Sequence, residues 1–194
     1  MSKKEDAEFY PDWCEEAPPE ESYRSILKWG DPNEFKHPNK KLYKLMKQVF
    51  EMTDDDFKTT QKMGLEKVSY NKSINLSKEQ IKVFENIVGS ENVKKDDYSR
   101  LQIAYGKTMI DLMRLREGIV ENVPDIVIHP RSKEDIEKIV KYCNEQKIPV
   151  YVYGGGSSVT RGVECVKGGV SLDMRVHMNK VLKFNEENQT ITVE

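Results

Sequence analysis

The fold class is most clearly indicated by residues 125–163, DIVIHPRSKEDIEKIVKYCNEQKIPVYVYGGGSSVTRGV. This stretch opens with a short β-branched run closed by Pro130, which is typical of a buried strand. Ser132 is an N-cap residue with acids in the following turn, and apolar residues then recur at helical spacing up to Cys143. IPVYVY, residues 148–153, reads as a second strand and ends at three glycines. The order strand, helix, strand, glycine loop predicts an α+β domain.

Two further segments continue this domain. GGVSLDM, residues 168–174, predicts a third strand. KVLKFNEENQTITVE, residues 180–194, predicts two strands joined at residues 186–188 as a hairpin. Because the sequence stops within a strand pattern, we expect the chain to be an N-terminal fragment, with residues 124–194 as the first part of an incomplete domain.

The upstream half has a different character. Residues 1–38 mix acids, prolines and aromatic residues without periodicity, which predicts an extended arm. Residues 39–123 predict a helical region followed by a connector; Ser77 and Gln80 form a capping box at the start of one helix. Within this region, residues 95–123 combine aromatic rings with cations and predict a partly buried connector.

Composition excludes several functional classes. The 194 residues hold 31 Lys and Arg against 33 Asp and Glu, a net charge of −2, which argues against a nucleic-acid partner. The three cysteines lie far apart without a CxxC pair, so we predict no metal site. The sequence shows no signal-peptide core and no run long enough to span a membrane. We therefore expect a soluble, cytoplasmic protein without a transmembrane segment.

The glycine triplet, residues 154–156, needs a physical reason, because each glycine costs backbone entropy. Consecutive N–H groups in such a loop can form a concave nest for an anion, typically a phosphate. A dinucleotide fingerprint starting at Gly154 would need a third glycine where Val159 stands, and the Gly-Lys-Ser/Thr end of a P-loop does not follow. A tight turn without a ligand would explain the triplet equally well.

Residues 125–163, followed by GGVSLDMRVHMNKVLKFNEENQTITVE (residues 168–194), closely resemble the start of the FAD-binding domain of the vanillyl-alcohol oxidase superfamily, also called PCMH-type. The resemblance implies the first subdomain of that fold, truncated here and preceded by the helical N-terminal region. It implies FAD as the cofactor. It also implies that the catalytic residues lie beyond Glu194, so that they are unknown here. It also implies that the FAD diphosphate is wrapped by Val152, Tyr153, Gly154, Gly155, Gly156, Ser157 and Ser158.

Within the superfamily, YSRLQIAYGKTMIDLMRLREGIVENVPD, residues 98–125, resembles the lead-in of the alkyldihydroxyacetonephosphate synthase subfamily, as does the pair Trp29–Gly30. That resemblance implies ether-lipid synthesis, in which a fatty alcohol replaces the acyl group of acyl-dihydroxyacetone phosphate. An FAD-dependent 2-hydroxyacid dehydrogenase or oxidase, of the lactate or glycolate type, is one alternative. An inactive truncated remnant is another, and we expect the 194-residue chain alone to be inactive.

Some superfamily members bind flavin covalently through a histidine in this loop. Ser157 stands at the matching position here, which predicts non-covalent FAD. We expect a structural role for His129 at a strand end and a solvent-facing position for His177 in a turn. The resemblance further implies a small-molecule or lipid substrate, with the peripheral membrane contact that lipids would require. It is also compatible with a homodimer of the full-length protein.

Overall fold

The computed structural model describes residues 18–26, 40–58, 62, 64–106 and 108–194. The chain divides into two compact units, which we describe separately. One consists of Met1–Lys67 with Met113–Ile119, and the other of Val68–Leu112 with Val120–Glu194. The predicted extended arm lies outside the described residues except for 18–26, and so does the Trp29–Gly30 pair.

The described residues of the first unit include the short helices α1 (Tyr23–Ile26), α2 (Lys40–Val49) and α3 (Asp54–Lys58), together with the last part of α6 (Met109–Arg116). The rings of Tyr43 and Phe57 lie 4.6 Å apart, and Lys47 Nζ lies 2.7 Å from an Asp54 carboxylate oxygen. These contacts join α2 to α3, and the predicted helical character of this region is confirmed.

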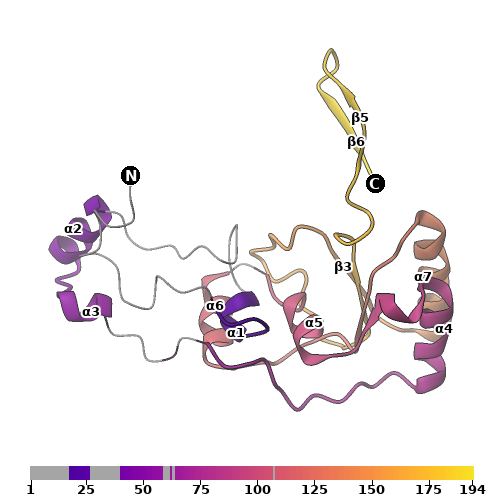
Figure 1. Ribbon diagram of the computed structural model, residues 1–194, viewed down its shortest axis with the longest axis horizontal. Coiled ribbons are helices and arrows are strands. Elements are labelled where there is room, and N and C mark those ends of the chain that lie inside the picture. The colour runs from indigo at the N-terminus through magenta and orange to yellow at the C-terminus, as the bar shows by residue number, and fades with distance from the viewer. Residues whose placement is uncertain (1–17, 27–39, 59–61, 63, 107) are drawn as a thin grey trace. The chain divides into compact units, whose positions relative to one another are not determined.

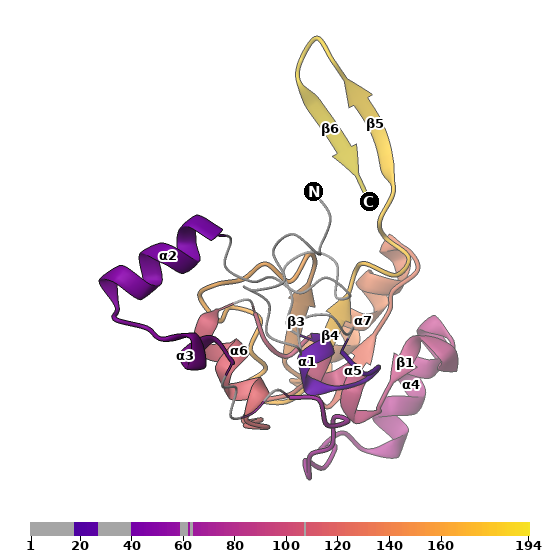
Figure 2. The same ribbon diagram turned by 60° about the vertical axis from the view of Figure 1, so that its left-hand side comes forward.

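The second unit is built on a sheet with the strand order β1-β2-β4-β3 (Figure 2). Its strands are β1 (Val93–Lys94), β2 (Ile126–Ile128), β3 (Val150–Tyr153) and β4 (Val170–Asp173). β2 and β3 each pair with β4 in parallel, whereas β1 pairs with β2 antiparallel. The three strands predicted from the sequence are confirmed. β1 was not predicted, since two residues are too few to show alternation.

Two helices cover one face of this sheet. α4 (Lys78–Val88) and α7 (Lys133–Gln146) lie side by side (Figure 1). Both predicted caps are confirmed: Ser77 and Gln80 form a capping box, and the Ser132 side chain accepts from the Asp135 N–H. The core beneath them is apolar and consists of Phe84, Val88, Val93, Ile126, Ile128, Ile139, Cys143, Ile148, Val170 and Leu172.

The opposite face of the sheet packs against a smaller cluster. Ile103, at the end of α5 (Asp97–Gln102), is buried with Val127 and Tyr153. The segment predicted as a partly buried connector contains two helices that were not predicted, α5 and α6 (Met109–Arg116). Helix α6 has no clear amphipathic pattern, because its apolar residues do not share one face: Met109, Ile110 and Met113 are exposed, whereas Leu115 is buried.

Buried polar side chains tie the segments before β2 to the sheet. Asp125 accepts hydrogen bonds from the backbone N–H groups of Asn75 at 2.7 Å and Gly169 at 2.6 Å. Arg100 is 3% exposed, and its guanidinium donates to the carbonyl oxygens of Pro124 at 2.8 Å and Lys72 at 3.1 Å. Asp125 and Arg100 thus both have polar partners, which offset the cost of their desolvation.

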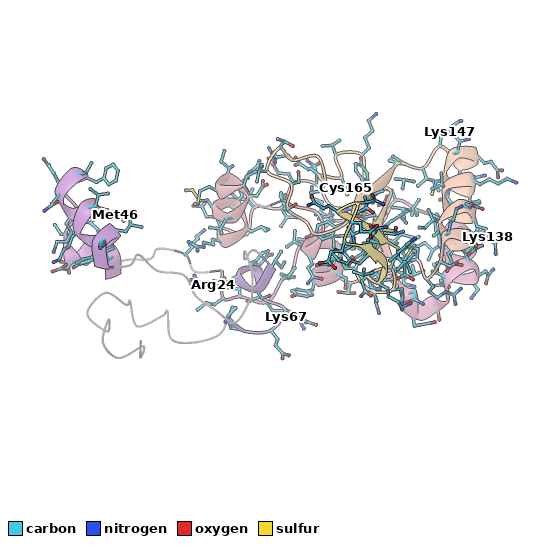
Figure 3. All side chains as sticks on the ribbon, turned by 90° about the horizontal axis from the view of Figure 1, so that it is seen from above. Arg24, Met46, Lys67, Lys138, Lys147 and Cys165 are labelled. Atoms are coloured by element: carbon cyan, nitrogen blue, oxygen red, sulfur yellow. The ribbon has the colours of Figure 1, made fainter. Side chains whose placement is uncertain are left out.

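The predicted hairpin is confirmed as β5 (Val181–Asn185) paired with β6 (Thr190–Val193), and it projects from the sheet (Figure 1). Almost all of its side chains are exposed. Figure 3 shows Lys138 and Lys147 pointing outward from α7, while Cys165 lies among crowded side chains. Within the described ranges, no helix has the length and apolar character needed to cross a membrane.

Candidate functional site

Three parallel strands end at the same edge of the sheet. The register pairs Ile128 and Val152 with Leu172, and Tyr153 with Asp173, so β2, β3 and β4 finish level with one another. Ligands of open sheets with parallel strands bind outside the carboxyl ends of the strands. A ligand-binding site is therefore expected at this edge, and the glycine loop begins there.

The glycine loop, residues 154–158, follows directly after Tyr153 at the end of β3. Gly154 and Gly155 are exposed, and a Cβ added to either would meet no atom within 4 Å. Among the described residues, none accepts a hydrogen bond from the backbone N–H groups of residues 154–158. An open backbone with free donors is the arrangement that an anion nest requires.

Gly156 differs from its two neighbours. Its φ is +65°, and an added Cβ would lie 2.0 Å from the Tyr153 hydroxyl oxygen. The Tyr153 side chain therefore packs directly against the backbone of the loop. Gly156 is required by the fold of the loop itself, whereas Gly154 and Gly155 leave space for a ligand.

The remaining predicted loop residues vary in exposure. Val152 is exposed and Tyr153 is buried, while Ser157 is exposed and Ser158 is half-buried. Ser158 Oγ accepts a hydrogen bond from Gly162 N at 3.2 Å, which closes the loop on its downstream side. The structure thus places Val152 and Tyr153 at the end of β3 and the other five predicted residues on the loop that follows, at the sheet edge.

The lead-in segment packs against this loop. A Cβ added to Gly106 would lie only 2.1 Å from the Ser158 carbonyl oxygen, so the two backbones are in direct contact. Tyr105, beside it, is buried, and its hydroxyl accepts from Glu121 N at 2.8 Å. Sequence reasoning did not connect Gly106 with the loop, since the two are more than forty positions apart in the sequence.

A buried carboxylate stands at the end of β4. Asp173 is 3% exposed and accepts from Arg175 Nε at 2.9 Å and from Arg175 Nη2 at 2.8 Å. Burial by itself would raise the pKa of Asp173, but the Arg175 hydrogen bonds outweigh it and hold that pKa below its ordinary value. The pair is therefore ionised at neutral pH.

The two described histidines lie close to this edge but outside the loop. His129 Nε2 is 3.9 Å from Asp173 Oδ2, and burial lowers the pKa of His129. His177 is half-buried, with Nε2 2.8 Å from Asn92 Oδ1. The expectation that His177 faces solvent was wrong, because the turn after β4 folds back onto the segment before β1.

Arg161 lies beyond the loop and faces several acids. Its guanidinium is 3.0 Å from Glu164, 3.6 Å from Asp111 and 3.8 Å from Glu121. Asp111 is 1% exposed, and neither of its carboxylate oxygens has a hydrogen-bond partner. This cluster holds the segment after the glycine loop against the lead-in, so both sides of the loop are fixed.

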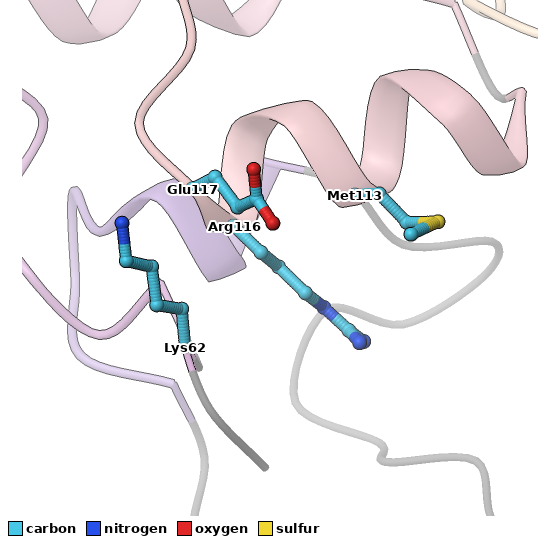
Figure 4. Close-up of a pocket in the computed structure, with 4 residues that line it drawn as sticks. All are labelled: Lys62, Met113, Arg116 and Glu117. Carbon is cyan, nitrogen blue, oxygen red and sulfur yellow. The ribbon is translucent and has the colours of Figure 1, made fainter.

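Two further features of the described residues were considered as sites. In the first unit, a hollow of about 490 Å³ is lined by Lys62, Met113, Arg116 and Glu117 (Figure 4), without a serine, cysteine or histidine among these residues. In the second unit, burial raises the pKa of Cys143 to about 11 and that of Cys165 to about 12. Both thiols are therefore protonated at neutral pH and poor nucleophiles.

Comparison with known proteins identifies the segment that carries the loop. The profile of the family described as FAD binding domain matches residues 124–194. These residues are therefore similar to a segment of an FAD-binding domain. The family binds FAD, and the glycine loop lies inside the matched segment.

The similar curated proteins include a synthase and a dehydrogenase. The chain is 30% identical over 165 residues to an alkyldihydroxyacetonephosphate synthase from Trypanosoma brucei brucei, a match that covers 81% of the chain and 27% of the synthase. It is 42% identical over 73 residues to the mitochondrial D-lactate dehydrogenase [cytochrome] from Arabidopsis thaliana, covering 38% of the chain and 13% of that enzyme.

A solved structure of an alkyldihydroxyacetonephosphate synthase superimposes with a TM-score of 0.58 at 30% identity, covering 63% of the chain and 24% of the synthase. The recognised family and the α+β fold class are thus confirmed. The chain spans about a quarter or less of each of these proteins.

The difference between the loop glycines predicts different effects on stability. Gly156→Ala should lower the free energy of unfolding by about 1–2 kcal/mol from the positive φ alone, with a further loss from the contact with Tyr153. Gly155→Ala should change it by less than about 0.5 kcal/mol, as for an ordinary surface position. Urea denaturation of the two variants measures both values, and equal losses would contradict the assigned roles.

Proposed function

We propose that Val152, Tyr153, Gly154, Gly155, Gly156, Ser157 and Ser158 hold the diphosphate of FAD. The observation that supports this most strongly is the set of free backbone N–H groups in residues 154–158, beside two glycines above which a Cβ would meet nothing. Donors that are fixed before binding and lack competing partners can bind an anion without first breaking other hydrogen bonds.

The protein's own contribution is to bind and orient the cofactor. When bound, the flavin supplies the reactive ring system, and the protein surrounding it sets position and electrostatics. The glycine loop offers donors without a charged side chain of its own between Val152 and Thr160. We propose that it recognises the diphosphate mainly through backbone geometry.

We further propose that the whole protein acts as an alkyldihydroxyacetonephosphate synthase, with a fatty alcohol replacing the acyl group of acyl-dihydroxyacetone phosphate. The support is the extent of similarity: the trypanosomal match covers 81% of the chain, whereas the D-lactate dehydrogenase match covers 38%. The synthase match therefore extends upstream of the FAD-binding segment, where Gly106 packs against the glycine loop.

An FAD-dependent 2-hydroxyacid dehydrogenase is the second candidate. It is favoured by the higher identity, 42%, in the shorter matched segment. We propose that the 194-residue chain alone binds FAD only in the micromolar to millimolar range and is inactive, because a few exposed hydrogen bonds provide limited affinity. We also propose that the full-length protein is located in the cytoplasm. It would contact membranes peripherally and form a homodimer.

Binding of FAD to the loop can be tested on the chain as given. Titration with FAD should shift the amide resonances of residues 154–158 in a ¹H–¹⁵N spectrum. Gly155→Val should raise the Kd about tenfold or more, because it covers the donors without disturbing the fold. Gly162→Val is the matched control, an exposed glycine where an added Cβ meets only Ser158 Oγ, at 3.8 Å. Unchanged affinity in Gly155→Val would overturn the assignment of the loop.

Non-covalent attachment gives a second test. Ser157 offers no imidazole for a covalent link, and His129 and His177 lie outside the loop. Flavin bound to the full-length gene product should therefore be released when the protein is denatured with acid or heat. Flavin fluorescence that stayed with the polypeptide band on a denaturing gel would contradict this, and peptide mapping would identify the attachment site.

The reaction class can be decided with the flavin-loaded, full-length gene product. Incubation with acyl-dihydroxyacetone phosphate and a labelled fatty alcohol should transfer the label to the product and release a fatty acid. A parallel reaction with D-lactate or glycolate and an artificial electron acceptor should show no reduction of the acceptor. Reduction of the acceptor without label transfer would favour the dehydrogenase.

A further inference from the structure

Three side chains form a connected stack between the end of β4 and the glycine loop, which we call the Asp173–Arg175–Tyr153 stack. Asp173 receives two hydrogen bonds from the Arg175 side chain and a third from the Arg175 backbone N–H at 3.1 Å. The Arg175 guanidinium carbon lies 4.7 Å from the centroid of the Tyr153 ring. The guanidinium thus lies close to the ring while two of its nitrogens are held by the carboxylate.

The far end of the stack reaches the loop. The Tyr153 hydroxyl lies where a side chain on Gly156 would begin, so the ring supports the loop at its positive-φ residue. Tyr153 is 3% exposed, and its ring packs with Ile103 and Val127 on the sheet. A displaced Tyr153 ring would therefore remove a direct support from Gly156.

The base of the stack is rigid. Asp173 is the last residue of β4 and pairs with Tyr153 of β3 in the parallel register. The carboxylate and the ring therefore start from adjacent positions on neighbouring strands. The Arg175 side chain contacts both the Asp173 carboxylate and the Tyr153 ring, so the two residues are linked through their side chains as well as through the strand pairing.

We propose that Arg175 is a positioning residue for the cofactor site, which acts by holding the Tyr153 ring beneath Gly156 and thereby keeps the N–H groups of the glycine loop directed at one anion. This inference rests on the proposed FAD-binding function. Arg175 is not assigned as a direct ligand, because its Nε and Nη2 donors are used by Asp173 and its positive charge is balanced there.

A matched control exists in the same unit. Arg131 forms the same kind of pair with Asp135, with Nε at 3.0 Å and Nη2 at 3.5 Å from the carboxylate oxygens. The side chains are similarly exposed: 47% and 8% for this pair, against 42% and 4% for Arg175 and Asp173. Arg131→Met therefore removes a comparable ion pair that does not support the loop.

The first measurement needs no ligand. In the FAD-free chain, Arg175→Met should shift the amide resonances of residues 154–158, whereas Arg131→Met should leave them unchanged. Thermal unfolding of both variants controls for general loss of stability. Loop resonances unchanged in Arg175→Met, or equally shifted in Arg131→Met, would overturn the positioning role.

The second measurement is FAD titration. Arg175→Met should raise the Kd about three- to tenfold, the range expected for loss of a partly buried cation–π contact. Arg175→Lys should raise the Kd as much, because a lysine ammonium cannot both contact the Tyr153 ring and form a bidentate pair with Asp173. Full affinity in Arg175→Lys would instead indicate direct contact between the charge and the diphosphate, and would refute the proposal.

A double-mutant cycle completes the design. Tyr153→Leu removes the ring, so adding Arg175→Met to it should cause no further loss of affinity. Additive losses would show that Arg175 acts independently of Tyr153 and would overturn the inference. If FAD failed to perturb the loop of the unmutated chain, the proposed function would fail, while the ligand-free spectra would still decide the role of Arg175.

Discussion

The parallel pairing of β4 with both β2 and β3 is the constraint on which the candidate site depends. Backbone hydrogen bonds fix the register, and the register brings the ends of three strands to one level. Tyr153 and Asp173 thus become neighbours although they lie in different segments of the chain. The glycine loop leaves the sheet at this level, so its starting position is set by hydrogen-bonded strands.

The segment between β3 and β4 is held at its far end as well. Gly168 and Gly169 both have positive φ, and an added Cβ would lie 2.8 Å from Asp125 Oδ2 at the first and 2.4 Å from the Pro149 carbonyl oxygen at the second. Asp125, buried at the start of β2, accepts the Gly169 N–H. A loop fixed at both ends can keep unpaired donors in place, which an unsupported loop of glycines would not do.

These features explain why the upstream segment and the FAD-binding segment behave as one body. The family match begins at residue 124, whereas the compact unit that contains it also includes Val68–Leu112. Gly106 against Ser158, and Arg161 against Asp111, are the contacts that link the two segments at the loop. Similarity to the synthases extends into this upstream segment, in keeping with its place in the site.

Most of the local structure of this protein could be predicted from its sequence. Alternating apolar runs, helix caps and turn residues act over a few neighbouring positions, and they predicted β2, β3, β4, α4, α7 and the terminal hairpin. The glycine triplet identified the loop for the same reason, because glycine's freedom is a local property. Helix α6 and strand β1 were missed where the local pattern is weak or too short.

The contacts that support the loop became visible only in the folded structure. A side chain at Gly156 would collide with the Tyr153 hydroxyl, whereas one at Gly155 would meet no other atom. The Arg175 guanidinium lies against the Tyr153 ring, and His177 lies within hydrogen-bond distance of Asn92. None of these follows from spacing along the chain. Each depends on strand register and on contacts between segments distant in sequence, and those are fixed only when the sheet has formed and its two faces are covered.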